Sequence, residues 1–256
     1  MSFANVAHQK IYYETEGAQG VPVVFVHGSG SNHTIWLPQV HASSVIARAV
    51  AIDLPGHGQS DLPGKKSVDA YGDVILGLLD ALRFDRAVIV GHSLGGAIAL
   101  TLALSHSDRV AGLGLVSTGA RLRVLPAILD GIVNDFEKTA SFIVEHAYAP
   151  NLGDDARARA MAELRACNPH VTHDDYAACN AFDVMARLGE INAPTIVICG
   201  KQDRMTPYKY SEFLASKIAE RGAQLVLVDN AGHSVMIEQP EAVSRALFDF
   251  LKNLDA

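Results

Sequence analysis

The chain has 256 residues, of which 49% are hydrophobic and 19% are charged, and its formal net charge is −7. This length and composition allow one large domain with a substantial buried core, and they exclude a disordered chain. The modest negative charge argues against a nucleic-acid or membrane partner. Because the sequence shows neither a secretory signal nor an apolar run long enough to cross a bilayer, we expect a cytoplasmic protein.

Short apolar runs of strand length alternate with longer segments of helical period along most of the chain. After a hairpin over residues 4–16, strands are expected at residues 21–28, 48–56, 86–93, 110–119, 194–203 and 223–232. Helices are expected at residues 69–84, 93–106 and 208–222. This alternation predicts an α/β fold with a mostly parallel, eight-stranded sheet that helices cover on both faces.

One connection between strands is much longer than the others. Residues 120–183 contain no strand pattern, but they contain amphipathic stretches that prolines separate. Because a structureless loop of this length is unusual, we expect a helical cap, or lid, inserted after the sixth strand. Residues 1–119 and 184–256 then form the core, and the cap lies over the carboxyl edge of the sheet, where open α/β sheets bind ligands.

The segment Gly91-His92-Ser93-Leu94-Gly95 joins a predicted strand to a predicted helix. In this context G-x-S-x-G indicates a sharp turn that lifts the serine side chain clear of the sheet. The following helix would direct free backbone N–H groups toward negative charge that develops at the serine. Ser93 is therefore the predicted nucleophile.

A serine nucleophile needs a base and an acid that orients this base. His233 follows the last predicted strand at the same edge of the sheet, whereas His27 and His57 are interpreted as residues that pack within turns. Asp203 follows the preceding strand and is the predicted acid. Asp229 is the alternative, although its position at a strand end favours a role as a turn cap.

The order Ser93, Asp203, His233 resembles that of the α/β-hydrolase family, and the resemblance covers almost the whole chain. Small bacterial carboxylesterases, enol-lactonases and carbon–carbon bond hydrolases are close in pattern. The resemblance implies an oxyanion loop at residues 27–30, in which the Ser29 N–H joins the Leu94 N–H, with Gly30 as the alternative to Ser29. It also implies a turn at residues 53–60, to which we assign a structural role.

The expected activity is hydrolysis of small to medium, mainly apolar carboxylic esters through an acyl-enzyme. Lactone or carbon–carbon bond cleavage by the same residues is an alternative, and so is a receptor of this fold with low turnover. The expected substrate contacts are Gly28, Gly30, His92, Phe142 and Phe182. A small-molecule ester is the expected partner, and the oligomeric state is not readable from the sequence.

Arg121 and Arg123 follow a predicted strand end and could bind a substrate carboxylate, but loop and surface contacts are the preferred interpretation. No cofactor is expected, because the segment from Gly28 to His33 lacks the third glycine of a dinucleotide site. No metal is expected either, because the sequence contains no H-E-x-x-H and its histidines are not grouped at ligand spacing.

Overall fold

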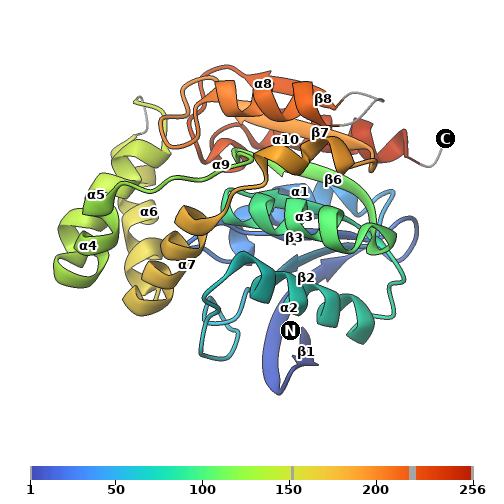
Figure 1. The fold of residues 1–256 in the computed structure, drawn as a ribbon, viewed down its shortest axis with the longest axis horizontal. Helices are drawn as coiled ribbons and strands as arrows, with labels where there is room; N and C mark the ends of the chain where they lie inside the picture. The colour runs from blue at the N-terminus through green and yellow to red at the C-terminus, as the bar shows by residue number, and fades with distance from the viewer. Residues whose placement is uncertain (1, 151–152, 219–222, 255–256) are drawn as a thin grey trace.

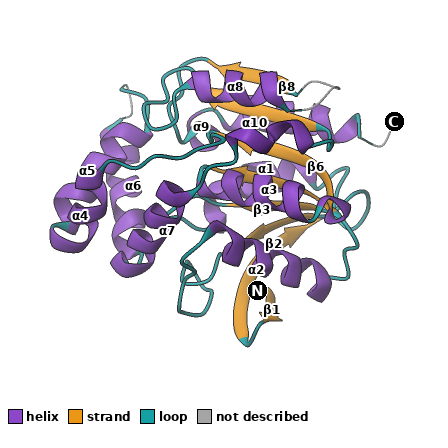
Figure 2. Ribbon diagram, viewed as in Figure 1, coloured by secondary structure: helices purple, strands orange, loops and turns teal. Residues whose placement is uncertain are grey.

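The computed structural model describes residues 2–150, 153–218 and 223–254, and it contains one eight-stranded sheet (Figures 1 and 2). The strands are β1 Ser2–Val6, β2 Gln9–Glu16, β3 Val23–Val26, β4 Ala49–Ile52, β5 Ala87–His92, β6 Val110–Val116, β7 Thr195–Gly200 and β8 Gln224–Val228. Their spatial order is β1-β2-β4-β3-β5-β6-β7-β8. Only the β1–β2 and β2–β4 pairs are antiparallel, so the predicted mostly parallel sheet is confirmed.

Helices cover both faces of the sheet. The core helices are α1 Leu37–Ser43, α2 Val68–Ala81, α3 Leu94–Ser105, α8 Tyr208–Lys217, α9 Val235–Glu238 and α10 Pro240–Lys252. Short 3-10 helices are η1 His33–Trp36, η2 Ser107–Arg109 and η3 Met185–Glu190. The helix expected at residues 208–222 ends as α8 at Lys217, and residues 219–222 lie outside the described residues. None of the described helices is long and apolar enough to span a membrane.

The strands are apolar on both faces because each face packs against helices. In β3, Val23 and Phe25 belong to the core that includes residues of α1 and α10, whereas Val24 and Val26 belong to the core that includes residues of α2, α3 and α8. Successive side chains of a strand point to opposite faces, so an uninterrupted apolar run is buried completely only between two layers. This arrangement leaves the carboxyl ends of the parallel strands free to position functional loops.

The described residues of the long insertion form four helices at one end of the sheet (Figure 1). They are α4 Pro126–Asn134, α5 Phe136–Ala147, α6 Asp154–Ala166 and α7 Pro169–Ala181. The four helices share an apolar cluster that is separate from the two cores of the sheet. At the base of the insertion, an isolated antiparallel bridge pairs Arg121 with Asp183.

A buried carboxylate joins the insertion to the core of the domain. Asp175 of α7 is fully buried, and its Oδ1 accepts a hydrogen bond from the Tyr71 hydroxyl at 2.6 Å. Its Oδ2 accepts from His57 Nε2 at 2.9 Å and from the Gly30 backbone N–H at 3.2 Å. His57 is therefore more than a turn-packing residue, because it forms a buried pair with a carboxylate of the cap.

This buried pair gives an expected pH dependence of stability. Burial alone would lower the pKa of His57, but the Asp175 charge and hydrogen bond raise it above the ordinary value of about 6.5. Because the pKa of His57 is raised in the folded state, protonated His57 stabilises the fold. This stabilisation is complete at pH values below the ordinary pKa, and it disappears as the pH rises through the pKa of the folded state. The free energy of unfolding lost in His57→Gln should therefore be largest at pH values below about 6.5, and it should shrink as the pH rises above this value through the raised pKa of His57.

Urea unfolding of the wild type and His57→Gln across this pH range measures the difference. His41→Gln is the matched control, because the side chain of His41 is 82% exposed and its partner Glu16 is also solvent-accessible. A difference for His57→Gln that grows with pH would contradict the assigned charge state.

Candidate active site

Ser93 lies at the turn between β5 and α3 in a backbone conformation that is unusual for a residue with a side chain, with φ +52° and ψ −112°. Its carbonyl accepts hydrogen bonds from the Thr118 hydroxyl at 2.8 Å and from the backbone N–H groups of residues 96 and 97. A Cβ at Gly95 would overlap the carbonyl oxygen of Val26, so the helix approaches β3 this closely only with glycine there. The turn leaves the Ser93 side chain partly exposed at the pocket described below.

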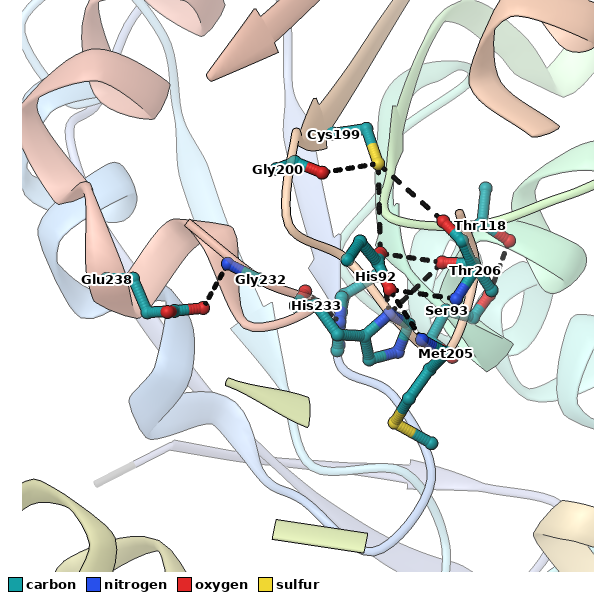
Figure 3. Close-up of polar contacts among 11 residues, drawn as sticks. His92, Ser93, Thr118, Cys199, Gly200, Met205, Thr206, Gly232, His233 and Glu238 are labelled. Carbon is teal, nitrogen blue, oxygen red and sulfur yellow. Dashed lines mark hydrogen bonds and ion pairs between the residues drawn. The ribbon is translucent and has the colours of Figure 1, made fainter. Parts of the chain in front are cut away.

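His233 and Asp203 lie on the loops after β8 and β7. Figure 3 shows the His233 side chain beside Ser93. His233 Nδ1 lies 2.9 Å from Asp203 Oδ2, and both residues are buried. If this nitrogen donates to the carboxylate, Nε2 is the ring nitrogen left free to accept a proton. His233 and Ser93 line the same pocket.

Asp203 is held by hydrogen bonds from Met205 and Thr206 in addition to its contact with His233. Its Oδ1 accepts hydrogen bonds from the backbone N–H groups of Met205 and Thr206 at 2.9 and 2.8 Å, and its Oδ2 accepts from the Thr206 hydroxyl at 2.8 Å. Burial alone would raise the pKa of Asp203, but the charge of His233 and these hydrogen bonds lower it below its ordinary value. The carboxylate is therefore ionised at neutral pH and oriented toward the imidazole.

The alternative acid, Asp229, lies on the surface. Its side chain is 73% exposed and forms an ion pair with Lys201 at 2.8 Å. Thr206, in contrast, contacts both members of the pair, because its hydroxyl also lies 3.1 Å from His233 Nδ1. Thr206 was not among the predicted site residues, and its only sequence signal is its position three residues after Asp203.

His92 lies directly before Ser93 and lines the pocket. Its Nε2 donates to the His233 carbonyl at 3.1 Å, and the two rings lie 4.7 Å apart between centroids. Burial, and next the proximity of His233, lower the pKa of His92 well below its ordinary value. A neutral imidazole at position 92 therefore supports the backbone of His233 without adding a second positive charge.

The predicted oxyanion loop follows β3 and packs against the nucleophile turn. A Cβ at Gly28 would lie 2.7 Å from His92 Nδ1 and 3.2 Å from Ser93 Cβ, so this approach requires glycine. The Gly30 N–H donates to Asp175, whereas the Ser29 N–H and the Leu94 N–H have no protein acceptor among the described residues. The geometry therefore favours Ser29 over Gly30 as the partner of Leu94 in an oxyanion site.

A pocket opens over Ser93 between the core and the cap. Its cap wall is formed by Ile143, Val144, Ala147, Ala160, Leu164 and Tyr176, and its core side includes Ser29, Gly30, Ile35 and Met236. Glu163 also lines the pocket, and burial raises its pKa. Most of the wall is thus apolar, and it also carries the Glu163 carboxyl group and the Arg123 guanidinium.

Two expected substrate contacts on the cap are corrected by the structure. Phe142 is 40% exposed and stacks on His146, and Phe182 is buried against the core of α2 and α3, so neither lines this pocket. The helical pattern predicted apolar faces, but it could not show which neighbour each apolar side chain packs against. The residue next to Phe142, Ile143, faces the pocket instead.

Arg121 and Arg123 form long ion pairs with Asp183 at 3.8 and 3.7 Å at the base of the cap. Arg123 also donates to the Asn180 carbonyl at 2.7 Å and reaches the rim of the pocket. Arg121 thus has the loop and surface contacts of the preferred interpretation, whereas Arg123 also lines the pocket, where a substrate carboxylate is the alternative partner.

Glu238, which was not among the predicted site residues, connects the cap to the loop that bears His233. Its carboxylate accepts a hydrogen bond from the Ala149 N–H at 2.8 Å. It also accepts one from the Gly232 N–H at 2.9 Å (Figure 3). The Ser234 N–H also donates to the Ala147 carbonyl at 2.9 Å. The end of α5 is thereby fixed beside His233.

The family model described as "Alpha/beta hydrolase family" matches residues 23–246 of the chain. The chain belongs to the alpha/beta hydrolase family. Its family assignment thus agrees with both the sheet order and the strand–turn–helix position of Ser93.

Solved structures and curated relatives of this alpha/beta hydrolase cover nearly its whole length. The chain is 35% identical to a thermophilic esterase, with a TM-score of 0.87 and coverage of 99% of this chain and 97% of that one. It is 31% identical to an N-acyl homoserine lactone degrading enzyme, with a TM-score of 0.87 and coverage of 97% and 100%. It is 30% identical to the 2-hydroxymuconate semialdehyde hydrolase of Pseudomonas sp. (strain CF600), with coverage of 94% and 90%.

The two candidate acids of this hydrolase can be separated by substitution. Asp203→Asn should lower kcat for p-nitrophenyl butyrate by roughly 10³-fold or more, because the amide no longer fixes the tautomer or stabilises the imidazolium. Asp229→Asn removes an exposed ion pair and should stay within about threefold of the wild type. Steady-state kinetics of both variants measures this difference, and equal losses would transfer the role away from Asp203.

Proposed function

We propose that this alpha/beta hydrolase cleaves carboxylic esters with small to medium, mainly apolar acyl groups through an acyl-enzyme on Ser93. The observation that supports this proposal is the position of Ser93 beside the His233–Asp203 pair in an apolar pocket. The 35% identity with a thermophilic esterase adds support for ester chemistry.

In the first half of the proposed reaction, Ser93 Oγ attacks the ester carbonyl while His233 Nε2 accepts the hydroxyl proton. Asp203 stabilises the imidazolium that forms. The tetrahedral oxygen carries the negative charge and accepts hydrogen bonds from the Ser29 and Leu94 N–H groups. When this intermediate collapses, the bond to the alcohol oxygen breaks and His233 protonates the leaving alcohol.

In the second half, water attacks the acyl-enzyme carbonyl, and His233 accepts a proton from this water. The second tetrahedral intermediate uses the same two backbone donors. Its collapse breaks the bond to Ser93 Oγ, which regains its proton from His233, and the carboxylic acid leaves. Each residue thus returns to its starting protonation state.

A lactone is a second candidate substrate, because it is a cyclic ester and requires the same attack on a carbonyl. The similarity to an N-acyl homoserine lactone degrading enzyme favours this candidate specifically. Comparing kcat/KM for simple alkyl esters and for N-acyl lactones of equal acyl length distinguishes the two substrate classes.

The nucleophile assignment is tested with Ser93→Ala. This variant should lose about 10³-fold or more of kcat for p-nitrophenyl acetate, because the members of a serine triad act as a unit. Its melting temperature should remain near that of the wild type, since the replaced hydroxyl is partly exposed at the pocket.

Ser105→Ala is the matched control, because Ser105 lies at the opposite end of α3. It should keep wild-type activity. Multiple turnovers by Ser93→Ala at the wild-type rate would contradict the proposal, and a wild type that stops after a stoichiometric burst would indicate a receptor.

The pocket wall gives a prediction about acyl length. Ile143→Ala should raise kcat/KM for octanoate relative to butyrate esters by roughly tenfold, because removing side-chain carbons extends the apolar pocket. Phe142→Ala changes the adjacent residue of the same helix outside the pocket, so its chain-length profile should match that of the wild type. A series of p-nitrophenyl esters measures both profiles, and an unchanged preference in Ile143→Ala would rule out α5 as the acyl wall.

A further inference from the structure

Three consecutive peptide groups of the oxyanion loop are each bonded by a different side chain. The Gly28 carbonyl accepts from His27 Nδ1 at 2.8 Å, the Gly30 N–H donates to Asp175 Oδ2 at 3.2 Å, and the Gly30 carbonyl accepts from Cys167 Sγ at 3.0 Å. His27 is the first residue of the loop itself, and the other two side chains belong to the insertion. Two of the three supports of the loop therefore come from the cap.

The first support sets the direction of the Ser29 N–H. The Gly28 carbonyl and the Ser29 N–H belong to one planar trans peptide, so they point in opposite directions. His27 Nε2 accepts from the Leu54 N–H at 3.0 Å, so the neutral ring has its proton on Nδ1, which donates to that carbonyl. Burial and the nearby His57 lower the pKa of His27 to about 4, so the ring is neutral at neutral pH. The two hydrogen bonds then select the tautomer.

The second support fixes the other side of Ser29. The peptide between Ser29 and Gly30 directs its N–H into the cap, where Asp175 accepts it. Gly30 has φ +62°, and glycine at such a position rotates easily unless something restrains it. The Ser29 backbone is therefore restrained on both sides, by His27 within the core and by Asp175 from α7.

Asp175 itself is held in one orientation. The Tyr71 hydroxyl binds Oδ1, and His57 Nε2 binds Oδ2 from the turn at residues 53–60. The carboxylate is fully buried, as are both partner side chains, so water does not compete for these contacts. Asp175 can therefore transmit the position of the cap helix to the loop beside Ser93.

We propose that Asp175 is a positioning residue for the reaction: it fixes the Ser29–Gly30 peptide from the cap and so directs the Ser29 N–H toward the substrate oxygen. The inference rests on the proposed function, because it concerns the oxyanion that forms at Ser93. It makes the cap part of the catalytic apparatus, since the oxyanion site is complete only when α7 is seated.

The test compares three variants that change the network in different ways. Asp175→Ala removes the acceptor of the Gly30 N–H. Asp175→Asn keeps a carbonyl oxygen for Gly30 and His57, while its amide can donate to the Tyr71 oxygen. Tyr71→Phe removes the contact on the opposite oxygen of Asp175 and leaves the Gly30 contact in place, so it is the matched structural control.

The measurements are kcat and KM for p-nitrophenyl butyrate, melting temperature, and the rate at which an alkyl fluorophosphonate labels Ser93. In this labelling, Ser93 Oγ bonds to phosphorus, fluoride leaves, and His233 accepts the hydroxyl proton while the phosphoryl oxygen occupies the oxyanion site. Asp175→Ala should lose about 10²-fold in kcat and in labelling rate, with KM changed by less than about threefold. Asp175→Asn and Tyr71→Phe should remain within about tenfold of the wild type in both rates.

If Asp175→Ala and Tyr71→Phe lose similar amounts of rate, and these losses follow the decreases in melting temperature, the inference is overturned. Asp175 would then have only a structural role. A folded Asp175→Ala protein that labels at the wild-type rate would also overturn it. Failure of the proposed function would give a different result: the wild type and Ser93→Ala would be labelled at the same rate. That result would overturn both the proposed function and this inference.

Discussion

The close approach of three backbone segments around Ser93 is the constraint on which the remaining structure depends. The nucleophile turn, the end of β3 and the oxyanion loop meet where side chains at Gly28 or Gly95 would collide with their neighbours. Ser93 itself adopts a positive φ, which costs on the order of 1–3 kcal/mol and persists only when the surrounding structure fixes it. The hydrogen bonds to its carbonyl and the parallel sheet behind it provide that restraint.

The insertion is fixed to the core on both sides of the pocket. On one side, Ala147 and Ala149 bond to the histidine loop through Ser234 and Glu238. On the other side, Asp175 bonds to the oxyanion loop. Displacing the cap would break these hydrogen bonds beside both loops. The cap thus restrains the two loops that flank Ser93 as well as covering the pocket.

The buried histidines differ in charge because their neighbours differ. Burial lowers the pKa values of His27 and His92, and each accepts or donates only hydrogen bonds that suit a neutral ring. His57 is equally buried, but the adjacent Asp175 carboxylate reverses the direction of its shift. A positive charge on His57 is therefore stabilised beside Asp175, whereas the ring of His92, next to His233, stays neutral.

The sequence alone determined the sheet, the strand–turn–helix position of Ser93, and the loops that bear Asp203 and His233. These features depend on local patterns: apolar runs buried on both faces, glycines at close backbone contacts, and polar residues at strand ends. The choice between Asp203 and Asp229 required the tertiary structure, because it depends on which carboxylate is buried. The choice between the Ser29 and Gly30 N–H groups also required it, because it depends on which of the two already has an acceptor. The tertiary structure also excluded Phe142 and Phe182 from the pocket and brought Asp175 to the oxyanion loop. An apolar or acidic residue on a helix has the same sequence signal whether it faces substrate, core or solvent, so only the packing of the cap against the core could decide these roles.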